Sequence, residues 1–362
     1  MQNYGGVAKS FSELIRIFHE NFLLGIDPIL TFTRSSNDYL KELAHLNLLP
    51  QRHFIPAKGG LSTLFTLGPI RAASSYWSGG STGKKSQTIH HATYYRPSWI
   101  ERRAASKLVV SVHDFIPEQL NWQGVRNPHI GKKHICERAD KIISVSESTT
   151  NQLLERYKIG IDRIATIHHG VRLKNPEEQK EQTQIPSNPT ILYVGHRDGY
   201  KNFTILVKTL KLAISRGLDF RLVTAGPKLS PLEESENAAL INSGVWTHHT
   251  TPNENLLGNL YKTSTVHVVT SLMEGFGMTI LESMSHGTPT LLSDIPVFRE
   301  VADRNALFFE PNSEESLLST IESMLNSQTY EQFSNASLIH ARNNSWDLAA
   351  TKYAKVYSEL MD

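Results

Sequence analysis

The residues best suited to chemistry stand in the segment VHVVTSLMEGFGMTILESMSHGTP, where a buried-strand pattern runs into Glu274 and a glycine-rich turn. A helix containing Glu282 is predicted to begin directly after that turn, near residue 278. Glycine lets a backbone turn tightly and approach a ligand, and the free amides at a helix start point at an anion. The amides near Met278 and Thr279 are therefore candidates for binding a phosphate.

Both glutamates are predicted to face hydroxyl groups, because a phosphate would repel a carboxylate placed directly against it. Sugar and ribose hydroxyls are good donors to carboxylates. Glu282 lies about one turn inside the predicted helix, on a face reached from the same opening. A structural interpretation stays open: Glu274 would then complement the helix dipole, and Glu282 would be a solvated surface charge.

Two cations follow another predicted strand, in the segment YVGHRDGYKNF, where the strand ends at Gly195. Arg197 and Lys201 fall in the turn before the next helix. Fixed cations at the carboxyl end of a strand suit a diphosphate, Arg as a planar fork and Lys as a point charge. Either residue alone is more often a surface charge, but together they predict an anion site shared with the glycine turn.

A third cluster, His113-Asp114-Phe115-Ile116-Pro117, follows the strand-like run LVVSV. A histidine at a strand tip can stabilise charge that develops across a cleft, and Asp114 can orient it or cap the following turn. The alternative is a histidine that is simply packed in a loop.

The elements that position these residues follow an α/β pattern. Short apolar runs alternate with longer amphipathic stretches, which is typical of parallel sheets covered by helices on both faces. Ligands bind at the carboxyl ends of such strands, where all three clusters stand. Strands are predicted in PILTFT, KLVVSVHD, KIISVS, RIATIHHG, TILYVG, FRLVTAG, VHVVTS and TPTLLSD, and helices at 202–217, near 278–286 and at 346–361.

The stretch KNPEEQKEQTQIPSNP at 174–189 lacks apolar periodicity and is typical of a linker. At 362 residues the chain also exceeds the usual size of a single core. We therefore predict two Rossmann-like, doubly wound domains facing a cleft, an N-terminal one at 1–178 and a C-terminal one at 179–345. The amphipathic helix at 346–362 fits either domain, including a return to the first.

Composition indicates a folded, soluble protein with 39% hydrophobic and 20% charged residues. The single cysteine, Cys136, cannot form an internal disulfide, so a reducing compartment is expected. The N-terminus lacks a signal-peptide pattern, and no window approaches the roughly 20 apolar residues that span a bilayer. These features predict a cytoplasmic protein.

Charge is divided unevenly along the chain. The net charge is +2, but residues 1–176 carry +10 and residues 177–362 carry −8. A basic first half can attract an anionic membrane surface or a lipid phosphate, although a solvated basic surface without a partner is the alternative. No nucleic-acid partner is expected, because no basic run is interleaved with aromatics and no nucleic-acid motif is present.

Taken together, these segments resemble the family 4 retaining glycosyltransferases, whose fold is GT-B. The resemblance covers nearly the whole chain, and the Glu274 and Glu282 motif, with seven residues between the two, is its most specific part. Further similar segments are QNYGGV, IHHATYY, VHDFIPE, ISVSESTTNQL, YVGHRDGYKNF and SDIPVFREV.

The resemblance implies a nucleotide-sugar donor bound by the C-terminal domain and an acceptor bound by the N-terminal one. On this basis Arg197 and Lys201 would neutralise the donor diphosphate. Glu282 would bind the ribose, and Glu274 would bind the transferred sugar. His113 would lie beside that sugar and the developing charge.

The resemblance also assigns roles to backbone groups. Amides around Phe276, Gly277 and Met278 would contact the sugar and phosphate, and Gly5 and Gly6 would line the cleft near the diphosphate. The chain begins at this glycine loop, without the strand that precedes it in the family. A second departure is THHTTP at 247–252, which replaces a glycine-containing turn where the family holds the base.

The implied reaction is departure of a nucleoside diphosphate from the anomeric carbon, with same-face attack by the acceptor. Fixed cations and helix amides can stabilise the leaving phosphate, so neither a metal nor another cofactor is expected. The segments GYKN and SDIPVFREV resemble mannosyltransferases of bacterial surface-polysaccharide and lipopolysaccharide synthesis. GDP-mannose is therefore favoured over UDP-sugars, with a glycan or lipid-diphosphate-linked acceptor at the inner face of a membrane.

The sequence leaves other functions open. A GT-B sugar-nucleotide epimerase or phosphorylase shares the architecture, although a phosphorylase is expected to be much longer. A non-catalytic, glycosyltransferase-like binding protein belongs to a different class. A dinucleotide-dependent dehydrogenase is less favoured, because neither strand-to-helix turn has the G-x-G-x-x-G spacing followed by an acidic residue.

Overall fold

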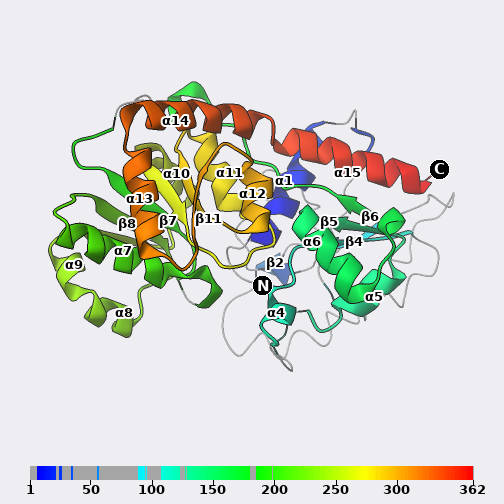
Figure 1. The fold of residues 1–362 in the computed structure, drawn as a ribbon. Coiled ribbons are helices and arrows are strands. Elements are labelled where there is room, and N and C mark those ends of the chain that lie inside the picture. Colours follow the sequence, from blue (N-terminus) through cyan, green and yellow to red (C-terminus); the bar gives the residue numbers. More distant parts are fainter. Residues whose placement is uncertain are drawn as a thin grey trace.

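The chain forms two lobes side by side, each built on its own parallel sheet (Figure 1). The first lobe contains the sheet β3 to β6, and the second lobe contains the sheet β7 to β12. The computed structural model describes residues 6–21, 24–26, 34–35, 55–56, 89–93, 95, 107–122, 127, 129–179, 185–197 and 199–361.

The first lobe has four described strands in the order β3-β4-β5-β6, all parallel. Val109, Val110 and Val112 are completely buried, as expected for a parallel strand covered on both faces. The strands are β3 (Ile89–Ala92), β4 (Lys107–Val112), β5 (Lys141–Ser144) and β6 (Ile164–Thr166), and the short strands β1 (Arg34–Ser35) and β2 (Ile55–Pro56) pair separately. The helical segments are α4 (Ile116–Gln119), α5 (Lys132–Arg138), α6 (Glu147–Gln152), η6 (Leu153–Tyr157) and η7 (Ile161–Arg163).

The second lobe has six parallel strands in the order β12-β11-β10-β7-β8-β9. They are β7 (Thr190–Val194), β8 (Arg221–Gly226), β9 (Trp246–Thr250), β10 (Val266–Val269), β11 (Thr290–Ser293) and β12 (Leu307–Phe309). The helices are α7 (Phe203–Ser215), α8 (Pro231–Glu236), α9 (Ala238–Asn242), α10 (Glu254–Thr263), α11 (Met278–Ser285), α12 (Pro296–Ala302), α13 (Glu314–Met324) and α14 (Ser327–Arg342). Two short turns, η8 (Pro176–Glu178) and η9 (Gly199–Lys201), precede β7 and α7.

The strand order of the second lobe reverses between β7 and β10. The chain grows from β7 toward β8 and β9 in one direction, and from β10 toward β11 and β12 in the other. Loops that leave the carboxyl ends of two such strands diverge and open a crevice, which is where open α/β sheets bind ligands. The turn after β7 and the glycine-rich turn after β10 therefore meet at the expected binding position.

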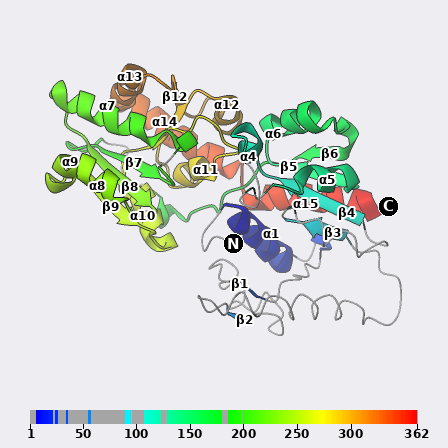
Figure 2. The ribbon, with the colours of Figure 1, turned by 90° about the horizontal axis from the view of Figure 1, so that it is seen from below.

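Two helices from opposite ends of the chain complete the first lobe. Helix α1 (Gly6–Glu20) and helix α15 (Trp346–Met361) pack together in one core with Val109 of β4 and Ile143 of β5. Figure 1 shows α15 continuing from α14 of the second lobe across to the first, and Figure 2 shows α1 lying between the lobes. The amphipathic periodicity of 346–361 predicts this helix, and its apolar stripe is buried on the first lobe.

The predicted α/β fold class is confirmed, and most predicted strands are present. Seven strands, β4 to β8, β10 and β11, lie within the predicted runs. PILTFT, at 28–33, lies outside the described residues. Among the described residues, none of the helices combines the length and the apolar composition that a membrane span requires.

Candidate active site

An ion pair between Lys201 and Glu274 stands at the point where the strand order reverses. Lys201 ends the short turn after β7, and Glu274 follows β10. The Lys201 Nζ atom lies 2.6 Å from Glu274 Oε1, and the Ser271 hydroxyl donates to the same oxygen at 2.8 Å. The structure thus joins two of the predicted site residues directly.

Backbone contacts fasten these two turns together. The Leu272 amide donates to the Tyr200 carbonyl at 2.8 Å, and the Thr270 hydroxyl donates to the Lys201 carbonyl at 2.7 Å. Burial alone would lower the pKa of Lys201, but the attraction of Glu274 outweighs it and raises that pKa. Lys201 is therefore a fixed, positively charged group at neutral pH.

Arg197 points toward the loop after β8. Its Nε atom lies 2.6 Å from Glu233 Oε1, and its Nη2 atom donates to the Lys228 carbonyl at 3.1 Å. Although burial raises it, the pKa of Glu233 is held at about 2, mainly by the hydrogen bond from Arg197. In the structure Arg197 is thus paired with Glu233, while its Nη1 atom is buried without a hydrogen-bond partner among the described residues.

The two glycines of the turn have different roles. Gly277 has φ +98°, a left-handed conformation that favours glycine, and it immediately precedes α11. At Gly275 a β-carbon would lie 1.7 Å from the His113 carbonyl oxygen of the first lobe. The Ser146 hydroxyl of that lobe also donates to the Gly275 carbonyl at 2.8 Å. The sequence predicts a glycine close to a ligand at 275, whereas the close neighbour in the structure is the other lobe's backbone.

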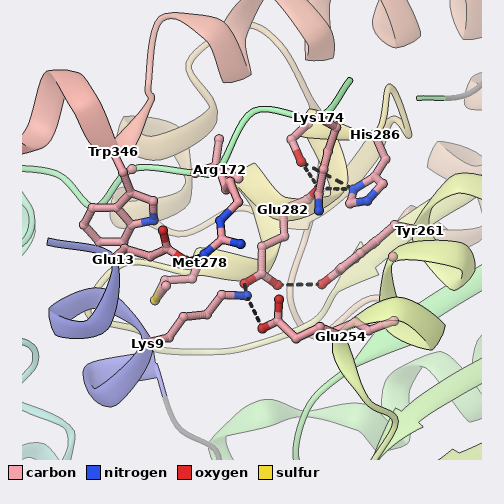
Figure 3. A pocket seen from close by; sticks show the side chains of 15 residues that line it. Lys9, Glu13, Arg172, Lys174, Glu254, Tyr261, Met278, Glu282, His286 and Trp346 are labelled. Carbon is pink, nitrogen blue, oxygen red and sulfur yellow. Dashed lines mark hydrogen bonds and ion pairs between the residues drawn. The ribbon is translucent and has the colours of Figure 1, made fainter. Parts of the chain in front are cut away.

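Glu282 lies inside α11 and is held by two partners that the sequence analysis does not identify. Lys9 of α1 lies 2.7 Å from Glu282 Oε1, and the Tyr261 hydroxyl donates to Oε2 at 3.0 Å (Figure 3). Burial raises the pKa of Glu282, but Lys9 offsets this and keeps that pKa below its usual range. Glu282 is therefore an ionised carboxylate that lines a pocket between the lobes.

The starts of α1 and α11 lie beside each other. A β-carbon at Gly6, the first residue of α1, would lie 3.3 Å from the sulfur of Met278, the first residue of α11. Thr279 is half-buried in the first turn of α11. Gly5 lies outside the described residues. Gly6, the described glycine of the predicted loop, is thus next to the predicted phosphate-binding helix.

His113 is buried between the lobes and packs on a second histidine. Its ring is 5.7 Å from the ring of His169, nearly parallel, and Phe276 packs edge-on against His169 at 5.1 Å. Both ring nitrogens of His113 are buried without a partner among the described residues. Burial lowers the pKa of His113 to about 4, partly opposed by Asp114, so the imidazole is neutral at pH 7.

A buried charge network supports the turn that carries His113. Lys132 is fully buried, and its ammonium donates to the Asp114 carbonyl at 2.6 Å. The same ammonium lies 2.8 Å from Glu118 Oε1, and His129 lies 3.1 Å from Glu118 Oε2. Asp114 itself accepts from the Ile116 amide at 2.9 Å, which is the turn-capping role considered for it.

The site also contains four residues that the sequence alone does not identify: Lys9, Tyr261, His169 and Glu233. Lys9 could have been noticed, because it follows Gly6 by three residues and so lies on the same face of α1. For Tyr261 and Glu233 no local signal exists, since each reaches its partner from a different element.

Comparison with known proteins gives the same architecture. Residues 4–175 match the family described as Glycosyltransferase Family 4, and residues 175–338 match the one described as Glycosyl transferases group 1. A glycosyltransferase from Rickettsia africae has a TM-score of 0.72 at 20% identity, covering 100% of this chain and 96% of that one. Anabaena HepE in complex with UDP-glucose has a TM-score of 0.72 at 14% identity, covering 98% and 96%. The two matches together cover residues 4–338 and identify the chain as a glycosyltransferase of these two families, and the solved structures show that it has the GT-B fold.

Two curated relatives carry more specific names. The O-antigen chain mannosyltransferase RfbU of Salmonella typhimurium is 27% identical over 193 residues, which is 53% of each chain. The O-antigen chain mannosyltransferase B of Escherichia coli is 24% identical over 290 residues, covering 76% of this chain and 75% of the relative. The match thus spans about half the length of the first relative and three quarters of the second.

Proposed function

We propose that the protein is a retaining glycosyltransferase that moves a hexose from a nucleotide-sugar to an acceptor hydroxyl. One observation carries the proposal: the Lys201–Glu274 ion pair lies at the strand-order reversal, and the adjacent glycine turn begins α11. A cation, a carboxylate and a helix start are thereby placed against the opposite lobe. This combination suits a ligand with both a diphosphate and sugar hydroxyls.

The donor diphosphate would bind to Lys201 and to the first amides of α11. Glu274 shares the Lys201 ammonium and would accept hydrogen bonds from the transferred sugar. The partnerless Nη1 atom of Arg197 supports a role for that side chain at the phosphate as well. As the nucleoside diphosphate departs, these fixed groups would stabilise its charge, so the chemistry as proposed needs no metal or other cofactor.

His113 would act as a neutral group beside the sugar. Its pKa of about 4 means that the ring carries one N–H donor and one acceptor at pH 7. A neutral imidazole can donate to a sugar hydroxyl without adding a positive charge next to the oxocarbenium-like carbon. Its two buried ring nitrogens, which have no partner among the described residues, support this role.

Mannose from GDP-mannose is the donor that we propose, ahead of UDP-sugars. The names of the two curated mannosyltransferases support mannose as the transferred sugar. The acceptor would be a glycan or lipid-diphosphate-linked glycan of bacterial surface-polysaccharide or lipopolysaccharide synthesis. The charge of +10 on residues 1–176 would favour contact with an anionic membrane at its cytoplasmic face.

Donor turnover tests the proposal. Purified protein is incubated with GDP-mannose or a UDP-sugar, with and without acceptor glycans, and nucleoside diphosphate release is followed for the wild type and for Glu274→Ala. Release with GDP-mannose that depends on Glu274 is the expected result. Conversion to another nucleotide-sugar would instead indicate an epimerase. Binding without any turnover would indicate a non-catalytic protein.

A further inference from the structure

Lys9 connects the two lobes through carboxylates of two different helices. It lies one turn inside α1, and its Nζ atom is 2.7 Å from Glu282 Oε1 of α11 and 3.3 Å from Glu254 Oε1 of α10. Figure 3 shows the ammonium reaching from α1 to both carboxylates at the edge of the pocket. The Lys9 and Glu282 side chains are 18% and 14% exposed, so the contact is largely shielded from water.

The charge on Glu282 needs such a partner. A buried carboxylate is costly unless it is paired and hydrogen-bonded, and it would repel a diphosphate bound at the nearby start of α11. Tyr261 provides a neutral hydrogen bond, whereas the Lys9 ammonium provides the opposite charge. The other two cations that line the pocket are paired with different carboxylates: Arg172 is 2.6 Å from Glu13, and Lys174 is 3.5 Å from Glu178. Lys9 is therefore the cation placed to offset Glu282.

The pair also leaves Glu282 able to bind hydroxyl groups. Each carboxylate oxygen can accept two hydrogen bonds, and the described residues use one position on each, Lys9 on Oε1 and Tyr261 on Oε2. Holding both oxygens from opposite sides fixes the plane of the carboxylate. The remaining acceptor positions match two neighbouring hydroxyls, as on the ribose of a nucleotide.

From this geometry we propose that Lys9 is a positioning residue for donor recognition. It orients and neutralises Glu282 so that this carboxylate accepts hydrogen bonds from the ribose hydroxyls. It also links the first lobe to the nucleoside part of the donor. This inference rests on the proposed function, since it takes the ligand to be a nucleoside diphosphate. It predicts that Lys9 controls discrimination between ribose and deoxyribose, although it belongs to the opposite lobe.

Calorimetry with GDP, UDP and their 2′-deoxy forms tests the inference. Wild type is expected to bind the ribose forms about tenfold or more tightly than the deoxy forms, the size of a lost hydrogen bond to a charged group. Lys9→Met keeps the aliphatic stem and removes the charge. It is expected to weaken ribose binding about tenfold and to bring the two forms close to equal affinity, while Lys9→Arg retains most of the discrimination.

Arg16→Met is the matched control, because it removes one positive charge from the same helix, from a residue paired with Glu13 and Glu20. Folding of each variant is checked by circular dichroism. In a Glu282→Gln background, Lys9→Met is expected to change the ribose to deoxyribose ratio no further, because Lys9 acts through Glu282.

The possible failures are distinguishable. If wild type binds nucleoside diphosphates and Lys9→Met still discriminates fully between the ribose and deoxyribose forms, the inference is overturned and the proposed function stays intact. The same holds for wild type that binds ribose and deoxyribose forms equally. Wild type that binds no nucleoside diphosphate would overturn both.

Discussion

The carbonyl oxygen of His113 and the backbone of Gly275 are in such close contact that a β-carbon at residue 275 would lie 1.7 Å from that oxygen. The same β-carbon would lie 2.8 Å from Cβ of Asp114. Both neighbours belong to the first lobe, and neither is the movable end of a flexible side chain. Any side chain at 275 would therefore push the lobes apart at the site.

Gly275→Ala is expected to lower the unfolding free energy by about 2 kcal/mol, the range of an overpacked core. Because the two lobes could no longer close on each other, donor turnover should fall more than tenfold. Thermal denaturation and nucleoside diphosphate release measure the two effects. In the control Gly160→Ala, the nearest atom is the carboxylate oxygen of exposed Asp162, which can turn away. Equal stability and turnover in both variants would contradict the close contact.

Glu118→Gln tests the buried network beneath the His113 turn. Lys132 is completely buried, so removing the charge of Glu118 takes away the carboxylate that its ammonium is paired with. Breaking a buried ion pair on one side costs about 3 to 5 kcal/mol in unfolding free energy, which urea denaturation measures. The control Glu137→Gln breaks an exposed ion pair with Lys133, which lies 3.8 Å away on α5. It is expected to lower the unfolding free energy by about 0.5 kcal/mol or less. A similar cost for both variants would mean that the Glu118 pair is not buried in solution.

Acid sensitivity should follow from the buried His113. Its pKa is about 4 in the folded protein against an ordinary value of 6.5, so between these values the unfolded chain binds the extra proton. Stability is therefore expected to fall as pH decreases from 6.5 to 4, and His113→Gln should make that slope shallower by up to about 1.4 kcal/mol per pH unit. Urea midpoints across this range, with His134→Gln as an exposed control, provide the measurement. Identical slopes for wild type and His113→Gln would show that His113 is accessible to protons when folded.

Elements with strong local patterns could be predicted from the sequence alone. The predicted C-terminal helix and α15 both cover 346–361, because apolar residues at helical spacing form one buried stripe. β4 and β5 begin where their apolar runs begin. The sequence does not predict β9, because WTHHT is mostly polar and lacks an apolar run. It lies at the edge of the sheet, where only one neighbour is needed and polar side chains are tolerated.

The site contacts that could not be predicted from the sequence are pairings between distant elements. Lys201 and Glu274 could be placed in one site because both follow strands, and strand ends meet at one edge of a sheet. The Lys9–Glu282 pair joins residues 273 positions apart on two helices, and only the packing of the lobes brings them together. Arg197 illustrates the same limit, since its partner Glu233 comes from a separate loop-helix unit.

Calorimetric titration of GDP and UDP into wild type, Lys201→Ala and Lys208→Ala tests the central claim most directly. Lys208 forms an exposed pair with Glu314 on α13, so its removal controls for loss of one charge in the same lobe. The account predicts binding to wild type and Lys208→Ala, and about tenfold or greater weakening in Lys201→Ala, as expected for losing a charge-assisted contact. Equal affinity in all three proteins, or no binding to wild type, would contradict a diphosphate site at Lys201.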